Sequence, residues 1–348
     1  MATSNLGDDD IDGPIYGTGG DDAFLIQTEA TDEIYVYGQG GEDEISISAR
    51  VSGAEHLYTW VDRTAAPLDV YAYAYGTAIL VQNGLDETSD PGNGLGGTVT
   101  FRAANFSGTA ENYVYGWSGD DAIDVRAHAG GADWCVADNY IHAGDGNDQI
   151  TARATIEDDP YAMATNRLWG EGGDDRIFSE IRGVQTESPF RSEVYGGEGE
   201  DRISVKGGDG NLLYGNQGDD SLYGSDASDQ LIGGQGADYL KGGGGEDAFV
   251  FMWAREGRDE RDQVADFHIG EDKIDLSEID ANVFRTGDQA FRFSGPDDWH
   301  GNGRVWLEDV GKTTTLVHVD TGRTEMTIAL LDGRDVHAED YGAGDFIL

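Results

Sequence analysis

The sequence is poor in cysteine and in basic residues. Cys135 is the only cysteine, which excludes an intramolecular disulfide as a cross-link of the fold. Lysine occurs only four times among 348 residues. Because nucleic acid and anionic membrane surfaces are bound through clustered Lys and Arg, both are poor partners for this chain, and we expect neither.

Long apolar segments are missing as well. No stretch is long and apolar enough to span a bilayer, so we expect no membrane span. The first ten residues, MATSNLGDDD, lack the basic start and the apolar run of a cleavable signal peptide. Export, if it occurs, must therefore use a secretion signal elsewhere in the chain.

Acidic residues dominate what is present. The chain has 68 Asp and Glu against 22 Lys and Arg, which gives a formal net charge of −46. Such a chain repels itself. It still contains 38% hydrophobic and 10% aromatic residues, enough for a core and unlike a disordered acidic tail. A cation must offset the carboxylates, and a divalent metal is the leading candidate.

A nine-residue repeat runs without interruption from Gly215 to Val250. Its copies follow G-G-x-G-x-D-x-U-x, where U is a large apolar residue. Glycines permit a tight turn with positive φ angles, and the last three residues form a short strand whose U side chain points inward. A degenerate fifth copy precedes these four. The residues in the Asp position are Asn211, Asp220, Asp229, Asp238 and Asp247.

Two copies of the repeat make one coil, so each turn lies above the turn two copies earlier. Asp220 then stacks on Asp238, and Asp229 stacks on Asp247. Stacked carboxylates repel unless a cation lies between them. Ca²⁺ prefers a shell of carboxylate and backbone carbonyl oxygens, which these turns supply. The repeat therefore predicts multiple calcium sites.

Upstream, the same turn recurs once per longer coil. Six segments share an apolar-aromatic-small lead-in, a glycine turn, an Asp and an apolar strand. Their aspartates are Asp22, Asp43, Asp121, Asp148, Asp175 and Asp201. The steps between them are 21, 78, 27, 27 and 26 residues, and 78 is three times 26. We therefore expect two further coils around residues 61–74 and 92–104, with strands at 70–75 and 98–101. Either these turns also bind calcium or their acidic residues are only solvated.

These periods predict an all-β fold, a parallel β-solenoid. We expect an N-terminal segment at 1–14 and wide coils of 21–27 residues over 15–205. A nonapeptide β-roll over 206–250 and a small β-rich cap over 251–348 should follow.

A second specific motif follows the repeats. Residues 262–277 read DQVADFHIGEDKIDLS, and the chain closes on DFIL. Together with the nonapeptides, these segments resemble RTX (repeats-in-toxin) proteins and, over roughly 196–348, the C-terminal domain of serralysin-type proteins. The resemblance implies calcium ligands at Asp201 and the repeat aspartates, less directly at Asn211, with Asp262 or Asp266 closing the last site.

The resemblance also implies an export route. Proteins of this kind pass through a type I ABC exporter that reads an uncleaved C-terminal signal, so we expect a secreted, extracellular protein that folds on calcium outside the cell. The final segment, Asp345–Leu348, would belong to that signal. Its deletion should then impair export without affecting folding.

The protease activity of serralysins is not expected here. None of the seven histidines is followed by Glu, so H-E-x-x-H is missing, and no nucleophile elbow occurs. No catalytic residue can be named. The leading hypothesis is a non-catalytic structural or adhesive protein that self-associates or contacts a cell surface or polysaccharide. The alternative is an extracellular polysaccharide lyase, epimerase or hydrolase with its groove on the wide coils.

Tyr71, Tyr73 and Tyr75 alternate with alanines, which places the three rings on one face of a strand. If the alanines face a narrow interior, the rings form an exposed strip suited to a polysaccharide or a partner. Otherwise they pack beneath a loop. Four tryptophans could extend the strip or fill the core: Trp60, Trp117, Trp134 and Trp169.

Overall fold

The computed structural model describes residues 2–6, 14–16, 22–28, 33–37, 44–51, 57–62, 68–74, 78–84, 98–105, 109–116, 119–130, 135–157, 161–183, 190–252, 261–281, 289–295, 301–331 and 336–348. Before residue 109, side chains are described only at 14–16, 23–25 and 34–36. The chain divides into two compact units, Met1–Val194 and Tyr195–Leu348.

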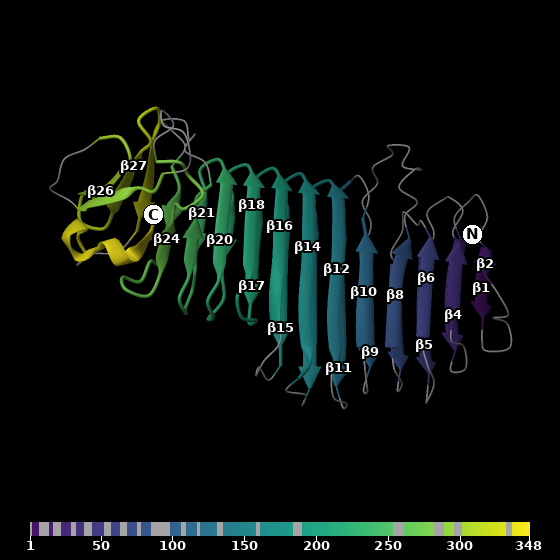
Figure 1. Ribbon diagram of the computed structural model, residues 1–348. Coiled ribbons are helices and arrows are strands. Elements are labelled where there is room, and N and C mark those ends of the chain that lie inside the picture. The colour runs from purple at the N-terminus through teal and green to yellow at the C-terminus, as the bar shows by residue number, and fades with distance from the viewer. Residues whose placement is uncertain are drawn as a thin grey trace. The chain divides into compact units, whose positions relative to one another are not determined.

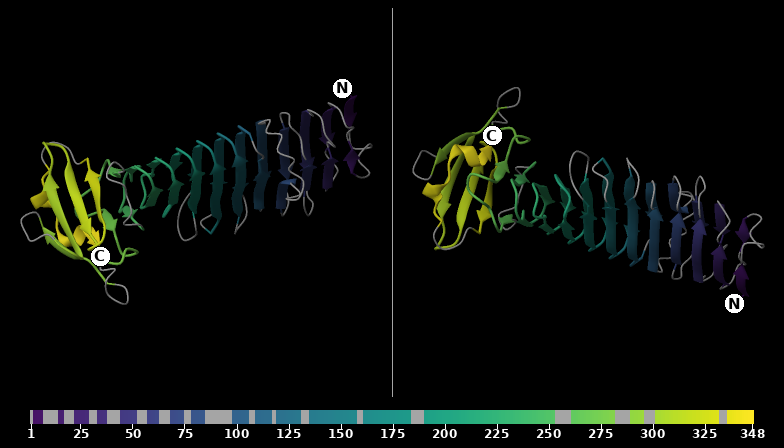
Figure 2. Two further views of the ribbon diagram at one scale, coloured as in Figure 1. Left: turned by 90° about the horizontal axis from the view of Figure 1, so that it is seen from above. Right: turned by 90° about the horizontal axis from the view of Figure 1, so that it is seen from below.

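The first unit consists of two parallel sheets whose strands alternate along the chain (Figures 1 and 2). One sheet contains, in spatial order, β1 (Ala2–Leu6), β3 (Asp22–Thr28), β5 (Glu44–Val51), β7 (Leu68–Ala74), β9 (Thr98–Asn105), β11 (Ala122–Gly130), β13 (Gln149–Glu157) and β15 (Arg176–Arg182). The other contains β2 (Ile15–Tyr16), β4 (Glu33–Tyr37), β6 (Leu57–Asp62), β8 (Ala78–Gly84), β10 (Thr109–Tyr115), β12 (Val136–Asp145), β14 (Met163–Gly172) and the beginning of β16 (Phe190–Glu198). This alternation confirms the predicted parallel β-solenoid.

The register of the wide coils follows the sequence period. Ile123 pairs with Ile150, and Ile150 with Ile177, so the strand partners are separated by the same step as the turn aspartates that precede them. Strands β7 and β9 lie between β5 and β11 in the sheet and pair with each other in parallel. The two coils predicted for the long interval between Asp43 and Asp121 are therefore confirmed.

The interior of the first unit is narrow and is lined by small and aliphatic side chains. Along β13, Ile150, Ala152 and Ala154 are fully buried and alternate with partly exposed residues, as expected for a strand with one inward face. A polar column crosses this core. The amide of Asn112 donates to Oδ1 of Asn139 at 2.8 Å, and the amide of Asn139 donates to Oδ1 of Asn166 at 2.7 Å. These hydrogen bonds satisfy the NH₂ groups of Asn112 and Asn139, which would be costly to bury alone, whereas Oδ1 of Asn112 is buried without a partner.

The second unit begins with the β-roll. One parallel sheet contains β17 (Arg202–Lys206), β19 (Ser221–Tyr223), β21 (Tyr239–Lys241) and β23 (Gln263–Val264). The other contains β18 (Leu212–Gln217), β20 (Gln230–Gln235), β22 (Ala248–Val250) and β24 (Lys273–Asp275). Leu222 pairs with Leu240, and Leu213 with Leu231, which confirms that two repeats form one coil. These four leucines are fully buried.

Parallel pairing extends past residue 250, where the repeat ends in the sequence. Strand β21 pairs with β23, and β22 with β24, although the partners are further apart in the sequence than those within the repeats. The inserted residues remove the nine-residue phase. Val264 and Ile274 nevertheless take the inward U position and are fully buried. The roll therefore continues by two strands into the segment predicted to be the cap.

The rest of the cap is β-rich, as predicted. Strand β23 pairs in parallel with β28 (Glu325–Leu330), and β28, β27 (Thr315–Asp320) and β26 (Arg304–Asp309) pair in antiparallel fashion. Strand β25 (Arg292–Gly295) lies parallel to β26. Two short 3₁₀ helices, Ala338–Asp340 and Ala343–Asp345, lead to β29 (Phe346–Ile347). Within the ranges given above, no helix has the length and apolar character needed to cross a membrane.

The C-terminal residues are part of the fold. Strand β29 pairs with β24, and Phe346 is buried and stacks on Phe293 with 5.1 Å between ring centroids. The carboxylate of Asp345 accepts hydrogen bonds of 2.8 Å from the backbone N–H groups of Gly270 and Gly342. Removal of these residues would uncover a strand and leave amides without acceptors. The expectation that their deletion leaves folding unaffected is therefore wrong.

Candidate metal centre

Each roll aspartate lies directly before a strand and hydrogen-bonds to the coil before it. Oδ1 of Asp220 accepts from the backbone N–H of Asp201 at 2.8 Å, and Oδ1 of Asp238 accepts from the N–H of Asp220 at 2.9 Å. On the other edge of the roll, Oδ1 of Asp247 accepts from the N–H of Asp229 at 2.9 Å. The predicted stacking of these residues is therefore present, as a ladder of carboxylates joined through backbone amides.

The ladder includes two aspartates beyond the repeat. Oδ1 of Asp262 accepts from the N–H of Asp238 at 2.9 Å, and Oδ1 of Asp272 accepts from the N–H of Asp247 at 3.0 Å. Asp272 is not among the site residues named from the sequence, because it lies outside the nine-residue phase and its turn lacks the two opening glycines of the repeat. The signal that could have found it is the shorter pattern D-x-U-x, which both DQVA and DKID satisfy.

The second carboxylate oxygen of three roll aspartates is buried and accepts no hydrogen bond. This holds for Oδ2 of Asp220, Asp238 and Asp247. Each Oδ2 faces the glycine that opens its own turn. A Cβ on Gly215 would overlap both Oδ2 of Asp220 and the carbonyl oxygen of Gly233, one coil further on. Glycine is therefore required there, and the space it leaves is lined by a carboxylate oxygen and a carbonyl oxygen.

The electrostatics of these turns favour a bound cation. Burial, together with the carboxylates of Asp238 and Asp201, raises the pKa of Asp220 from its ordinary value of 3.8 to about 8. Burial likewise raises the pKa of Asp238 and of Asp247 to about 7. The ionised carboxylates are costly because they are desolvated and face each other. An oxygen-seeking cation fits this set of ligands, because it would restore the ionised form and use the orphaned oxygens.

The wide-coil turns have the same geometry where they are described. Oδ1 of Asp148 accepts from the N–H of Asp121 at 2.7 Å, and Oδ1 of Asp175 accepts from the N–H of Asp148 at 2.7 Å. Oδ2 of Asp148 is buried without a hydrogen-bond partner, and burial raises the pKa of this carboxyl to about 7. Asp22 is the first residue of β3 but its side chain is not described, and Asp43 lies outside the described residues.

One predicted site residue behaves differently. The side-chain amide of Asn211 donates to Oδ1 of Asp229 at 2.6 Å and to the carbonyl oxygen of Gly207 at 3.1 Å. Oδ2 of Asp229 accepts from the backbone N–H of Ser225 at 2.6 Å. Both oxygens of Asp229 therefore have protein donors, unlike those of Asp220, Asp238 and Asp247.

A preformed cluster of three or more His, Cys, Asp or Glu side chains does not occur in the part of the chain that the structure describes. The turns instead bring together two stacked carboxylates at a time with the backbone carbonyls of glycine-rich loops. Ca²⁺ accepts such a mixed oxygen shell, whereas a nitrogen or sulfur ligand set would be expected for zinc.

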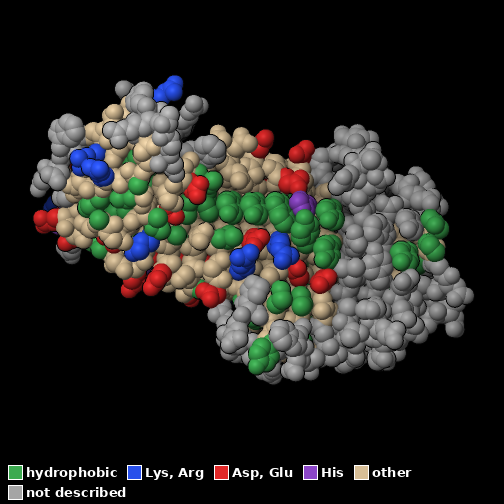
Figure 3. All heavy atoms as spheres, viewed as in Figure 1, with side chains coloured by type: hydrophobic (Ala, Val, Ile, Leu, Met, Phe, Trp, Pro, Cys, Tyr) green, Lys and Arg blue, Asp and Glu red, His purple; other side chains and the backbone are tan. Residues whose placement is uncertain are grey.

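An aromatic cluster lies on the outer face of β10, β12 and β14. His142 stacks on Trp169 with 4.4 Å between ring centroids and on Tyr115 with 5.5 Å. Figure 3 shows this patch as hydrophobic and histidine side chains with acidic groups beside them. Because the rings stack on one another, their faces are largely covered by neighbouring rings. Trp169 thus belongs to the outer surface, whereas Trp117, Trp134 and Tyr75 lie outside the described residues, as do the side chains of Trp60, Tyr71 and Tyr73.

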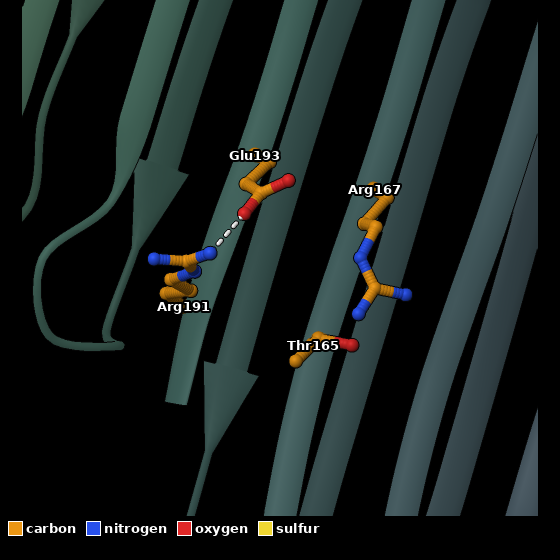
Figure 4. Close-up of a pocket in the computed structure, with 4 residues that line it drawn as sticks. All are labelled: Thr165, Arg167, Arg191 and Glu193. Atoms are coloured by element: carbon orange, nitrogen blue, oxygen red, sulfur yellow. Dashed lines mark hydrogen bonds and ion pairs between the residues drawn. The ribbon is translucent and has the colours of Figure 1, made fainter. Parts of the chain in front are cut away.

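A shallow hollow opens on the same face, lined by Thr165, Arg167, Arg191 and Glu193 (Figure 4). Arg191 forms an ion pair with Glu193, and Arg167 pairs with Asp138 at 3.0 Å. Thr165 also donates its hydroxyl to Asp138. The charges in this hollow are therefore balanced by partners within the protein.

The chain is similar to one protein family over most of its length. The profile described as peptidase M10 serralysin C terminal matches residues 27–330. No curated protein matches the chain significantly. Among solved structures, the chain is similar to the AlgE6R3 subunit of the mannuronan C5-epimerase from Azotobacter vinelandii. The sequence identity is 24%, 51% of this chain and 79% of that chain are covered, and the TM-score is 0.26.

Proposed function

The chain belongs to the peptidase M10 serralysin C-terminal family, and on that premise we propose that it is an RTX-type protein whose coils fold around several calcium ions. The observation that carries this proposal is the set of buried carboxylate oxygens at Asp220, Asp238 and Asp247 that accept no hydrogen bond. Buried polar atoms in native proteins nearly always have a partner, so these atoms require one. A calcium ion meets that requirement.

The proposed ligands in the roll are the aspartates that stack across coils: Asp201, Asp220, Asp229, Asp238, Asp247, Asp262 and Asp272. In the wide coils, Asp121, Asp148 and Asp175 stack in the same way. Asp22 and Asp43 are proposed from the sequence pattern alone. Bound calcium would supply the positive charge that lets stacked carboxylates ionise together. The glycine carbonyls of the same turns would complete its oxygen shell.

A calcium titration tests the proposal. Far-UV circular dichroism of the full chain should report little roll strand content in EGTA at pH 8 and a cooperative gain as Ca²⁺ is added. Asp220→Ala should shift this transition to higher calcium concentration. Asp209→Ala is the matched control, because Asp209 is an exposed acidic residue of the same roll. Equal strand content with and without Ca²⁺ would contradict the proposal.

Secretion and the biological role form a second part of the proposal. Family membership supports passage through a type I exporter and an extracellular location, where calcium is abundant. We assign the folded chain a non-catalytic structural or adhesive role in which copies of it associate. Light scattering in millimolar Ca²⁺ should then detect species larger than one chain. A strict monomer over a wide concentration range would argue against self-association.

A further inference from the structure

We propose that the interval between Asn211 and Asp229 is closed by protein hydrogen bonds and binds no calcium, so that the roll contains one metal-independent step among its calcium sites. This inference rests on the proposed calcium binding of the neighbouring turns and states which interval departs from it. It also corrects the expectation that Asn211 is a calcium ligand.

The side-chain amide of Asn211 takes the place of a cation between two coils. It donates to Oδ1 of Asp229 at 2.6 Å, to the carbonyl oxygen of Gly207 at 3.1 Å and to the hydroxyl of Ser225 at 3.3 Å. Its acceptors are thus a carboxylate oxygen of one coil and a backbone carbonyl oxygen of another, which are the types of oxygen that calcium would draw together. The amide carries no charge, so this interval also contains one carboxylate fewer.

The backbone of the facing turn has changed to match. Position two of the other turns has a positive φ: 80° at Asn216, 116° at Gly234 and 103° at Gly243. Ser225 occupies this position in its turn and is not among the residues with positive φ. Its N–H donates to Oδ2 of Asp229 at 2.6 Å, and its hydroxyl accepts from the N–H of Ala227 at 3.1 Å. This turn therefore satisfies its own carboxylate.

Two aspartates on the opposite edge of the roll have fewer hydrogen-bond donors than Asp229. At Asp220 and Asp238, the ladder bond to the preceding coil is present but Oδ2 has no donor. At Asp229, the same ladder bond is present, at 3.1 Å from the N–H of Asn211, and both oxygens are also bonded elsewhere. Both oxygens of the Asp229 carboxylate thus already have hydrogen-bond donors, so no cation is required between Asp229 and Asn211.

Counting bound calcium in variants of the full chain tests this. The chain is equilibrated in millimolar Ca²⁺, and bound metal per chain is measured by equilibrium dialysis and atomic emission. Asn211→Ala should bind as many ions as the wild type. Asn211→Asp, which restores the carboxylate of the repeat, should bind one more. Asp220→Asn is the positive control and should lose at least one ion.

A second measurement tests whether the hydrogen bonds of Asn211 stabilise the fold in the absence of calcium. In EGTA at mildly acidic pH, Asn211→Ala should unfold at lower urea concentration than the wild type, because the bonds across the interval are gone. Loss of one ion in Asn211→Ala, or an unchanged count in Asn211→Asp with the strand spectrum intact, would overturn the inference. If the wild type itself binds no calcium, the proposed function fails instead, which is a distinct result.

Discussion

Replacement of Asp220 by asparagine should change stability in opposite directions with and without calcium. The wild-type carboxyl is 1% exposed, and its pKa is raised from 3.8 to about 8. At pH 8 the unfolded chain has released this proton, whereas the metal-free fold retains about half of it. One pKa unit corresponds to about 1.4 kcal/mol, so this group destabilises the metal-free fold by at most about 5 kcal/mol.

Asparagine removes that charge and retains an oxygen for the N–H of Asp201. Its NH₂ group would lie in the space beside Gly215 that the carbonyl oxygen of Gly233 also lines, where it could donate a hydrogen bond as the amide of Asn211 does to Gly207. In EGTA at pH 8, Asp220→Asn should therefore be more stable than the wild type. In millimolar Ca²⁺ it should be less stable, because a ligand has been lost.

In EGTA at pH 8 the gain is measured as roll strand content by far-UV circular dichroism, and in millimolar Ca²⁺ the loss is measured by urea unfolding. Asp209→Asn is the control for a simple change of net charge in both solutions. The sign reversal should be found only in Asp220→Asn. If this variant is less stable than the wild type in both solutions, the orphaned oxygen has another partner and the reasoning is refuted. If Asp209→Asn gives the same gain in EGTA, general charge repulsion explains the effect.

Other parts of the structure give three further predictions. In EGTA, lowering the pH from 8 to 5 should increase roll strand content, because the folded carboxyls with pKa about 7 to 8 take up protons that the unfolded chain does not bind; unchanged circular dichroism would contradict this. Asn139→Ala should destabilise the first unit in urea by about 2–4 kcal/mol, equally with and without calcium, because three hydrogen bonds of its side-chain amide are lost; a calcium-dependent loss would oppose it. Phe346→Ala should destabilise the cap by about 3 kcal/mol in thermal unfolding, and an unchanged midpoint would show that β29 contributes nothing.

The sequence was sufficient to predict the coils, because their period places like residues in register. The step between Leu222 and Leu240, two repeats long, and the longer step between Ile123 and Ile150 became the observed strand pairs. The interval between Asp43 and Asp121 lacks the glycine-Asp motif, yet the number of coils in it could be predicted correctly. These predictions succeeded because strand pairing in a solenoid depends on local spacing and on which side chains face inward.

Other features could not be predicted, because they depend on contacts between turns. The nine-residue phase ends before Asp272, so the repeat spacing did not mark its place in the ladder, and only the shorter pattern D-x-U-x does. The identity of Asn211 suggested a weakened calcium ligand. Its actual bonds depend on the backbone of the turn at Ser225, which pattern matching does not describe. Similarly, the last four residues, DFIL, were predicted only to be part of a secretion signal, although Phe346 and Asp345 are buried in the cap.

The buried C-terminus constrains when the proposed exporter could read it. In the folded protein, Phe346 pairs with Ile274, and β24, which contains Ile274, pairs with β22, the last strand of the nonapeptide roll. Strand β29, which would carry the proposed secretion signal, is thus the outermost strand of a stack whose inner turns require neutralised carboxylates. Without calcium at neutral pH, those turns are destabilised by charge, which leaves the C-terminal strand without a stable template. Calcium would then complete the roll and bury the C-terminal segment in the same step. If the proposed exporter reads this segment, its recognition and the folding of the chain would be mutually exclusive.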